Sequence, residues 1–198
     1  MGVVLAQYTL IAGLGNPTGE YEKTRHNAGF WFVEEIARRE SVSWSQESRF
    51  EAAVAKYLCG DRKILLLRPA TYMNHSGRSI GAISRYYKIE FENIIVAHDE
   101  LDFQPGVVRL KKGGGHGGHN GVRDVISCLG GGSFLRVRIG IGRPGSGGSV
   151  LNYVLGRPGS IDSRAILSAL EETAALSDEL IFGRIDKAMN SLHTMAKN

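Results

Sequence analysis

The chain has 198 residues, of which 42% are hydrophobic, so it is long enough for one domain with a substantial core and short for two. Its net charge of +4 is unevenly spread, because residues 104–143 carry seven Lys or Arg and one Asp, a local charge of 7 − 1 = +6. That concentration indicates a polyanionic partner, although ordinary solvated surfaces also carry such clusters. No apolar run is long enough to form a transmembrane helix.

The first predicted element is a buried strand at residues 8–12, which delivers the loop GLGNP at residues 13–17. Residues 1–6 contain no basic leader and no myristoylation signal, so we expect a cytoplasmic protein. The two glycines of the loop invite comparison with a dinucleotide-binding fingerprint. That interpretation is disfavoured because Thr18 occupies the third-glycine position and no helical pattern opens at the glycines.

An amphipathic helix is predicted from about residue 30, after a polar stretch at residues 21–29. Its apolar face consists of Phe30, Val33, Ile36 and Ala37, and its polar side offers the i, i+4 pairs Glu34/Arg38 and Glu35/Arg39. His26 lies just before this helix and has polar neighbours on both sides. Two interpretations stay open for it, because a single histidine is more often structural than catalytic, but this one has no apolar neighbour.

Two strand-like segments, residues 50–58 and 63–67, are separated by the hairpin signal Gly60-Asp61. The second strand leads into a helix whose buried side is formed by Ile80, Ile83 and Tyr87. Asn74 lies between that strand and that helix, in a position like that of Asn16 after the first strand. Asn is also a favoured helix cap, so a structural role is the competing interpretation.

A β-branched run at residues 94–97 predicts a strand that meets His98, Asp99 and Glu100 at its carboxyl end. Ligands bind at that edge in α/β sheets. A carboxylate there could hold and orient an imidazole, which makes Asp99 a candidate, with a cap or turn residue as the alternative. Further strands are expected at residues 107–110 and 134–141, and the latter alternates Arg136 and Arg138 against Val137 and Ile139.

Six glycines lie in the stretch KKGGGHGGHNG at residues 111–121. Such a run gives the backbone φ > 0 freedom and exposes its N–H groups. Lys111 opens the stretch, and His119 and Asn120 close it at a predicted helix start. A cationic loop that feeds a helix N-terminus is typical of an anion site. A disordered linker is the alternative, although linkers are usually rich in Ser.

A glycine-rich loop at residues 140–148 and two helices at about residues 160–196 are predicted to close the chain. The helical stripes consist of Ile166, Leu167, Leu170 and Ala174, then Ile185, Met189, Leu192 and Met195 or Ala196. The alternation of strands and helices indicates an α/β fold, a single domain with a twisted, mixed, mostly parallel sheet flanked by helices. Cys59 and Cys128 suit neither a disulfide framework nor a zinc site, and we expect small buried residues in a reducing compartment.

The strand ends and loop junctions present one imidazole, one carboxylate and three carboxamides, namely His26, Asp99, Asn16, Asn74 and Asn120. If one sheet aligns them around a cleft, this set suits hydrolysis by water. The imidazole would act as general base, the carboxylate would fix its tautomer, and the carboxamides would hold water, the substrate carbonyl or the developing oxyanion. A covalent route is disfavoured because no nucleophile elbow such as G-x-S-x-G is present.

A metal centre is the main competing chemistry. His116 and His119 are spaced i, i+3, and together with His26 and Asp99 they offer zinc ligands. A glycine-rich loop is a poor rigid scaffold, so metal-free hydrolysis is preferred. A pure RNA-binding module is a second alternative, but such modules stack bases on exposed aromatic residues, and residues 104–143 offer only Phe134.

Five sequence motifs stand out, namely GLGNP at residues 13–17, YEKTRHNAG at 21–29, TYMN at 71–74, HDELD at 98–102 and GGGHGGHNGVRD at 113–124. In this order and spacing they closely resemble the bacterial-type peptidyl-tRNA hydrolase family, and the resemblance covers nearly the whole chain. It implies a monomeric, cofactor-free esterase without a metal. Such an enzyme cuts the ester between a peptide and the terminal ribose of tRNA, and so recycles tRNA from aborted translation.

The resemblance also implies individual roles, with His26 as the base and Asp99 as its orienting carboxylate. The residues that match those positioning substrate and water, or lining the cleft, are Asn16, Tyr21, Met73, Asn74, His119 and Asn120. Lys111 and Arg138 match the pair that holds the 5′-phosphate of tRNA. Thr18 departs from the family, which usually has Gly there, and Arg143 receives no role.

Overall fold

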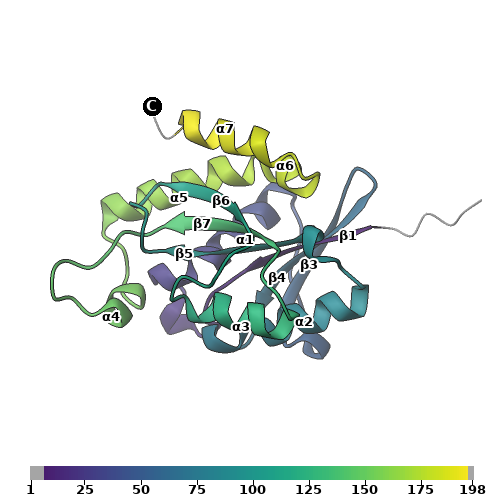
Figure 1. The fold of residues 1–198 in the computed structure, drawn as a ribbon, viewed down its shortest axis with the longest axis horizontal. Coiled ribbons are helices and arrows are strands. Elements are labelled where there is room, and N and C mark those ends of the chain that lie inside the picture. The colour runs from purple at the N-terminus through teal and green to yellow at the C-terminus, as the bar shows by residue number, and fades with distance from the viewer. Residues whose placement is uncertain (1–6, 196–198) are drawn as a thin grey trace, which may run out of the picture.

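The computed structural model describes residues 7–195, so the expectations for residues 1–6 and Ala196 lie outside the described part. Within it, one mixed sheet has the strand order β2-β3-β4-β1-β5-β7-β6 and crosses the middle of the molecule, with helices on both sides (Figure 1). The strands are β1 Tyr8–Gly13, β2 Ser45–Glu47, β3 Ala52–Cys59, β4 Arg62–Pro69, β5 Ile94–Glu100, β6 Val108–Lys112 and β7 Leu135–Gly140.

Seven α-helices accompany the sheet in the described residues. They are α1 Ala28–Arg39, α2 Ser76–Tyr87, α3 Asn120–Leu129, α4 Val150–Val154, α5 Ser160–Ala174, α6 Ser177–Ile181 and α7 Ile185–Met195. Short 3₁₀ turns connect several elements, and three of them carry candidate site residues. These are η1 Gly19–Tyr21, η2 Arg25–Asn27 and η4 Met73–His75.

The four central strands, β4, β1, β5 and β7, are parallel to one another. The hairpin predicted at Gly60-Asp61 joins β3 and β4, and the β2/β3 and β6/β7 pairs are antiparallel as well. The predicted α/β class with a mixed sheet is therefore confirmed. Because parallel strands end at one edge of a sheet, the loops that follow β1, β4 and β5 are brought together.

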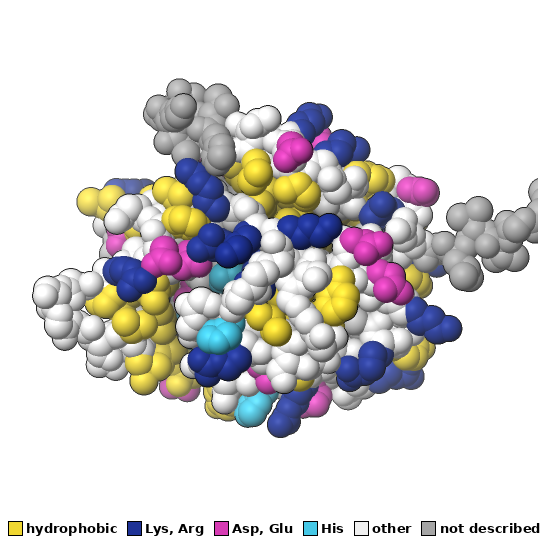
Figure 2. Space-filling view, in the orientation of Figure 1, with side chains coloured by type: hydrophobic (Ala, Val, Ile, Leu, Met, Phe, Trp, Pro, Cys, Tyr) yellow, Lys and Arg dark blue, Asp and Glu magenta, His cyan; other side chains and the backbone are white. Residues whose placement is uncertain are grey.

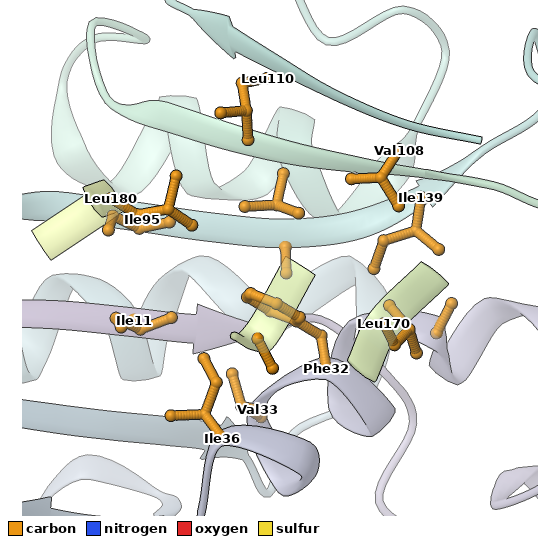
Figure 3. Packing of buried hydrophobic residues seen from close by; sticks show 14 of the residues in the cluster. Ile11, Phe32, Val33, Ile36, Ile95, Val108, Leu110, Ile139, Leu170 and Leu180 are labelled. Atoms are coloured by element: carbon orange, nitrogen blue, oxygen red, sulfur yellow. The ribbon is translucent and has the colours of Figure 1, made fainter. Parts of the chain in front are cut away.

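Two hydrophobic cores cover the two faces of the sheet. Alternate residues of β1 divide between them, since Ile11 packs with α1, α5 and α7 on one face and Leu10 packs with α2 and α3 on the other. Figure 3 shows Phe32 and Ile36 of α1 packed with sheet residues of the first core. Burial on both faces explains why the central strands are nearly continuous apolar runs.

Gly13 lets α1 pack directly against β1. A Cβ atom at Gly13 would lie 2.1 Å from the carbonyl oxygen of Gly29, so only glycine fits there. Close helix packing therefore accounts for this glycine without a nucleotide. Thr18 adopts an extended conformation, with φ −83° and ψ 147°, which any residue tolerates. Its departure from glycine thus brings no backbone strain.

The ion pairs predicted along α1 are wrong. Arg38 pairs with Glu35 at 2.6 Å, in an i, i+3 arrangement, and Glu34 pairs with Arg68 of β4 at 2.5 Å. The reason is that α1 lies over the sheet, where Arg68 competes for Glu34 with the helix's own cations. The expected Glu34/Arg38 and Glu35/Arg39 pairs do not form.

The C-terminal prediction is confirmed for α5 and α7 but misses α4 and α6. Each of these two helices has five residues, which is too short to show a helical period. Leu167 is 47% exposed and lies outside the buried stripe of α5. Cys59 and Cys128 are half-buried rather than buried, and both are free thiols.

Candidate active site at the carboxyl edge of the sheet

Three ionisable side chains meet where β5 ends. His26 lies in η2, Asp99 lies near the end of β5, and His119 immediately precedes α3. The Nδ1 atom of His26 is 2.9 Å from each carboxylate oxygen of Asp99, and the Nε2 atom of His119 is 2.8 Å from Oδ1. The three side chains are 14%, 3% and 9% exposed, respectively. One buried carboxylate therefore holds two imidazole rings.

The hydrogen bonds around these rings define their tautomers. The backbone N–H of Val122 donates to Nδ1 of His119 at 3.2 Å, so the proton of the neutral ring lies on Nε2 and faces Asp99. This bond also makes His119 the N-cap of α3. His26 donates from Nδ1 to Asp99, which leaves its Nε2 as the basic nitrogen.

Opposing effects set the pKa values of Asp99 and His26. Burial alone would raise the pKa of Asp99, but the charges and hydrogen bonds of His26 and His119 outweigh burial and hold it well below its usual value. Burial lowers the pKa of His26, whereas the charge and hydrogen bond of Asp99 raise it by more, so the net shift is upward. An ionised Asp99 can therefore stabilise the imidazolium that forms when His26 accepts a proton.

His98 packs behind His119 and remains neutral. Its Nδ1 donates to the backbone oxygen of Asp99 at 2.7 Å, and the two imidazole ring centres are 4.9 Å apart. Burial, followed by the proximity of His119, lowers the pKa of His98 to about 3. No pattern in the sequence singles out His98 as a site residue, because its role depends on this packing.

A metal would fit this group of side chains poorly. His26, Asp99 and His119 offer ligand atoms within 4.8 Å of one another, whereas the predicted fourth ligand, His116, does not belong to the group among the described residues. A metal on Nε2 of His119 would require the ring proton on Nδ1, where the Val122 N–H already points. The hydrogen bonds thus favour a protonated Nε2 over a metal ligand.

Asn16 is held from two sides. Its backbone N–H donates to Oδ1 of Asn27 at 2.8 Å, and its carbonyl accepts from Nδ2 of Asn27 at 2.9 Å. Its side-chain Oδ1 accepts the N–H of Met73 at 2.8 Å, which leaves Nδ2 as the donor available to a ligand. Asn27 is 2% exposed. The sequence offered only its place beside His26 as a signal, so its role was missed.

Asn74 and Asn120 are the other two predicted carboxamides. Asn74 follows Met73 in η4, and Asn120 follows His119 at the start of α3. Both are exposed, and within residues 7–195 neither side chain has a hydrogen-bond partner. The helix-cap alternative for Asn74 is wrong, because His75 occupies the N-cap position of α2.

The structure places Met73 and Tyr21 less directly at the site. The Met73 side chain is 4% exposed and fills the space beside Gly121, where a Cβ atom would lie 2.5 Å from its Sδ. It therefore supports the site from the core, and its backbone positions Asn16. Tyr21 is half-buried in η1, and no hydrogen bond of its side chain to the site residues is present in the described chain.

Two of the basic residues beyond the site are paired with carboxylates. Arg138 forms an ion pair with Glu100 at 2.9 Å, and Arg143, for which the sequence suggested no role, pairs with Asp102. The carboxylates partly neutralise both cations. Lys111, by contrast, forms no ion pair in the part of the chain that the structure describes.

The register of β6 and β7 groups the other cations. Lys111 lies opposite Arg136, and Arg109 lies opposite Arg138. All four side chains leave the sheet on the face that carries α3, because Val108, Leu110, Val137 and Ile139 occupy the opposite core. Figure 2 shows Lys and Arg gathered in a band across the middle of one face of the molecule, over the region of β6 and β7.

Several known proteins that resemble this chain in both sequence and structure are peptidyl-tRNA hydrolases. The sequence profile of the peptidyl-tRNA hydrolase family matches residues 10–198. The enzyme of Methylococcus capsulatus is 50% identical over 93% of this chain and 98% of its own length, and that of Actinobacillus pleuropneumoniae is 49% identical over 96% and 98%. The crystal structure of peptidyl-tRNA hydrolase from Acinetobacter baumannii, 43% identical, covers 96% of this chain and 97% of its own with a TM-score of 0.89. The chain belongs to the peptidyl-tRNA hydrolase family.

Proposed function

We propose that this protein hydrolyses the ester bond between a peptide and the terminal ribose of tRNA, and thereby frees tRNA for reuse in translation. Membership of the family supports the substrate. The observation that carries the chemistry is the arrangement of His26, Asp99 and His119, in which Nε2 of His26 is a basic nitrogen that has no assigned partner among residues 7–195.

The reaction begins with a water molecule beside His26. Nε2 takes a proton from the water as its oxygen attacks the ester carbonyl, and Asp99 stabilises the resulting imidazolium. The tetrahedral intermediate then collapses, the bond to the ribose oxygen breaks, and His26 returns its proton to that oxygen. The products are a peptide with a free carboxylate and a tRNA with a free terminal hydroxyl. No step requires a metal or an organic cofactor.

The three carboxamides position the reactants. Asn16 presents Nδ2 to the substrate carbonyl or its developing oxyanion, supported by the bonds that fix its other groups. Asn74 and Asn120 have exposed side chains and hold the attacking water and the peptide backbone. His119 orients Asp99, and Met73 and Tyr21 shape the cleft around them.

The cationic face binds the tRNA. Lys111 and Arg138 lie on neighbouring strands and on one face of the sheet, so both can reach the 5′-phosphate of the acceptor stem. Lys111 brings a charge that has no partner among the described residues, and Arg138 must share its charge with Glu100. The protein acts on this substrate as a cytoplasmic monomer. Among the described residues, no helix is long and apolar enough to cross a membrane.

Peptide release from two purified substrates tests this function. The wild type should release peptide from peptidyl-tRNA and leave an aminoacyl-tRNA of the same tRNA intact. His26→Ala should cleave neither substrate. Equal cleavage of both substrates would indicate an unselective esterase. Binding of peptidyl-tRNA without any release would indicate an RNA-binding protein and overturn the proposal.

A further inference from the structure

The three residues of η2 are bonded to three different parts of the molecule. His26 bonds the carboxylate of Asp99 in β5. Asn27 bonds the backbone of Asn16, in the loop that follows β1. Arg25 bonds α4, a helix that has no part in the reaction as described so far. A single 3₁₀ turn has weak hydrogen bonds of its own, so these outside contacts determine where the imidazole of His26 lies.

Arg25 is fastened to the C-terminal end of α4 by its backbone and by its side chain. Its backbone N–H donates to the carbonyl oxygen of Gly156 at 3.1 Å. Its Nη1 atom donates to the carbonyl oxygens of Tyr153 at 3.3 Å and Arg157 at 2.9 Å. The end of a helix offers such carbonyls because the last ones have no partner within the helix. The side chain of Arg25 is 11% exposed, so water competes little for these bonds.

Tyr153 links this end of α4 to the sheet. The guanidinium carbon of Arg25 lies 4.1 Å from the centre of the Tyr153 ring, a cation–π contact. The Tyr153 hydroxyl donates at 2.7 Å to the carbonyl oxygen of Ile141, the residue that follows β7. The N–H of Ile141 donates at 3.0 Å to the carbonyl oxygen of Glu100, which is the last residue of β5 and follows Asp99. The contacts of Arg25 thus lead back to the strand that carries the catalytic carboxylate.

Together these contacts form a closed circuit around the catalytic pair. One side of the circuit is the direct bond between His26 and Asp99. The other side runs through Arg25, Tyr153 and the ends of β7 and β5. Figure 1 shows α4 and the loop before it at the end of the sheet where β7 finishes. Two independent routes therefore fix the position of His26 relative to Asp99.

We propose that Arg25 is a positioning residue for the general base, which holds His26 in place by fastening η2 to α4, and that Tyr153 anchors α4 to the ends of the strands. Nε2 of His26 must lie within hydrogen-bond reach of the attacking water, and a displacement of about 1 Å costs on the order of 10²-fold in rate. Arg25 acts through His26 and not on the substrate. This inference rests on the proposed function and deepens it.

A carboxylate beside Arg25 supplies the matched control. Oδ2 of Asp162 in α5 lies 3.9 Å from Nη2 of Arg25, and the Asp162 side chain is 40% exposed. Such a long and partly exposed ion pair contributes little. Asp162→Asn removes this charge and leaves the three carbonyl bonds of Arg25 in place, so kcat and KM should stay at their wild-type values.

The main test is Arg25→Lys, assayed by single-turnover and steady-state release of peptide from peptidyl-tRNA. Lysine keeps the positive charge but lacks the planar group that stacks on Tyr153 and reaches two carbonyls at once. The single-turnover rate and kcat should fall about 10–100-fold, while KM stays unchanged. In the His26→Ala background there is no imidazole to position, so the further change Arg25→Lys should leave the residual single-turnover rate as it is.

A second variant leaves Arg25 in place. Tyr153→Phe removes only the hydroxyl bond to Ile141 and keeps the aromatic ring under the guanidinium, so the protein should fold. Its kcat should fall about 2–10-fold at unchanged KM, the equivalent of one neutral hydrogen bond. This variant decides the question if Arg25→Lys does not fold, and thermal unfolding of each preparation shows which case applies.

The inference is overturned if folded Arg25→Lys keeps the wild-type kcat, or if only its KM rises, because Arg25 would then serve substrate binding. It is also overturned if Arg25→Lys slows His26→Ala by the same factor as the wild type, because the effect would not pass through the base. A wild-type kcat in Tyr153→Phe overturns the role of Tyr153, and the whole inference if Arg25→Lys does not fold. Failure of the proposed function differs from all of these, since the wild type itself would release no peptide.

Discussion

The two functional regions of the molecule differ in how far their polar groups are satisfied. Around Asp99, both oxygens of the carboxylate are engaged, and in the described chain Nε2 of His26 and Nε2 of the buried His98 are left without a partner, of which only His26 is half-exposed. Around the loop that joins β6 to α3, the ammonium group of Lys111 and the backbone N–H groups of Gly115 and His116 have no partner in the described chain. In the proposed function, the first region serves a proton transfer and the second binds the tRNA. Substitutions in the first should therefore lower kcat, and substitutions in the second should raise KM.

The largest expected effect comes from the base. His26→Ala removes the proton acceptor, so kcat should fall on the order of 10²–10⁴-fold, the usual contribution of general base catalysis. KM should change little, because the proposed tRNA contacts, Lys111 and Arg138, lie on the β6/β7 pair. Single-turnover peptide release and tRNA binding, measured on the same preparation, check this. A variant with near wild-type kcat would show that another group is the base.

Substitution of the three carboxamide residues should have the next largest effect on the rate. Loss of a neutral donor at an oxyanion site costs ~2–4 kcal/mol of transition-state stabilisation, so Asn16→Ala, Asn74→Ala and Asn120→Ala should each be slow but measurable. Asn16 should affect kcat most, since its Nδ2 is held in place by three bonds to its other groups. Steady-state kinetics and thermal unfolding distinguish the roles. Unchanged kinetics with a lower melting temperature would show that these residues have only a structural role.

Lys111 should have a moderate effect that appears only in binding. Lys111→Glu should raise KM about 10-fold, leave kcat nearly intact and reduce the slope of binding against salt by about one, because one fewer counterion is released. The measurement is KM at several salt concentrations, with Lys112→Glu on the same strand as the comparison. An equal fall in kcat on peptidyl-tRNA with and without its 5′-phosphate would contradict the separation of the two regions.

Chelation should have the smallest effect. Because the Val122 N–H occupies Nδ1 of His119, the site suits hydrogen bonds better than a metal, and activity should persist after dialysis against EDTA. Loss of activity that returns on addition of zinc would contradict this assignment and revive the metal alternative for His26, Asp99 and His119.

Local patterns were enough to predict much of the fold. The apolar runs of the central strands, the hairpin at Gly60-Asp61 and the start of α3 at Asn120 all depend on neighbouring residues in the sequence. The meeting of the loops after β4, β1 and β5 at one edge of the sheet also followed, since these strands are parallel neighbours. Helices α4 and α6 could not be predicted because five residues show no period.

The parts of the site that were missed depend on long-range contacts. Asn27 and Arg136 look like ordinary polar residues in the sequence, and only the folded chain brings them to the loops that they hold. The same is true of Glu34, which bonds Arg68 across the sheet instead of a cation one turn away. A helix-period argument cannot decide between two cations when one belongs to another element.

The most direct test of the account is the pH dependence of the single-turnover rate in the wild type and in Asp99→Asn. In the wild type, the rate should fall toward acid with a midpoint above 6.5, because Asp99 raises the pKa of His26 against the effect of burial. In Asp99→Asn, burial remains and the carboxylate is gone, so the midpoint should move to lower pH while the plateau drops about 10–100-fold, the loss of one hydrogen bond to a charged group. A midpoint that stays in place or moves to higher pH would contradict the assignment of His26 and Asp99 as the catalytic pair.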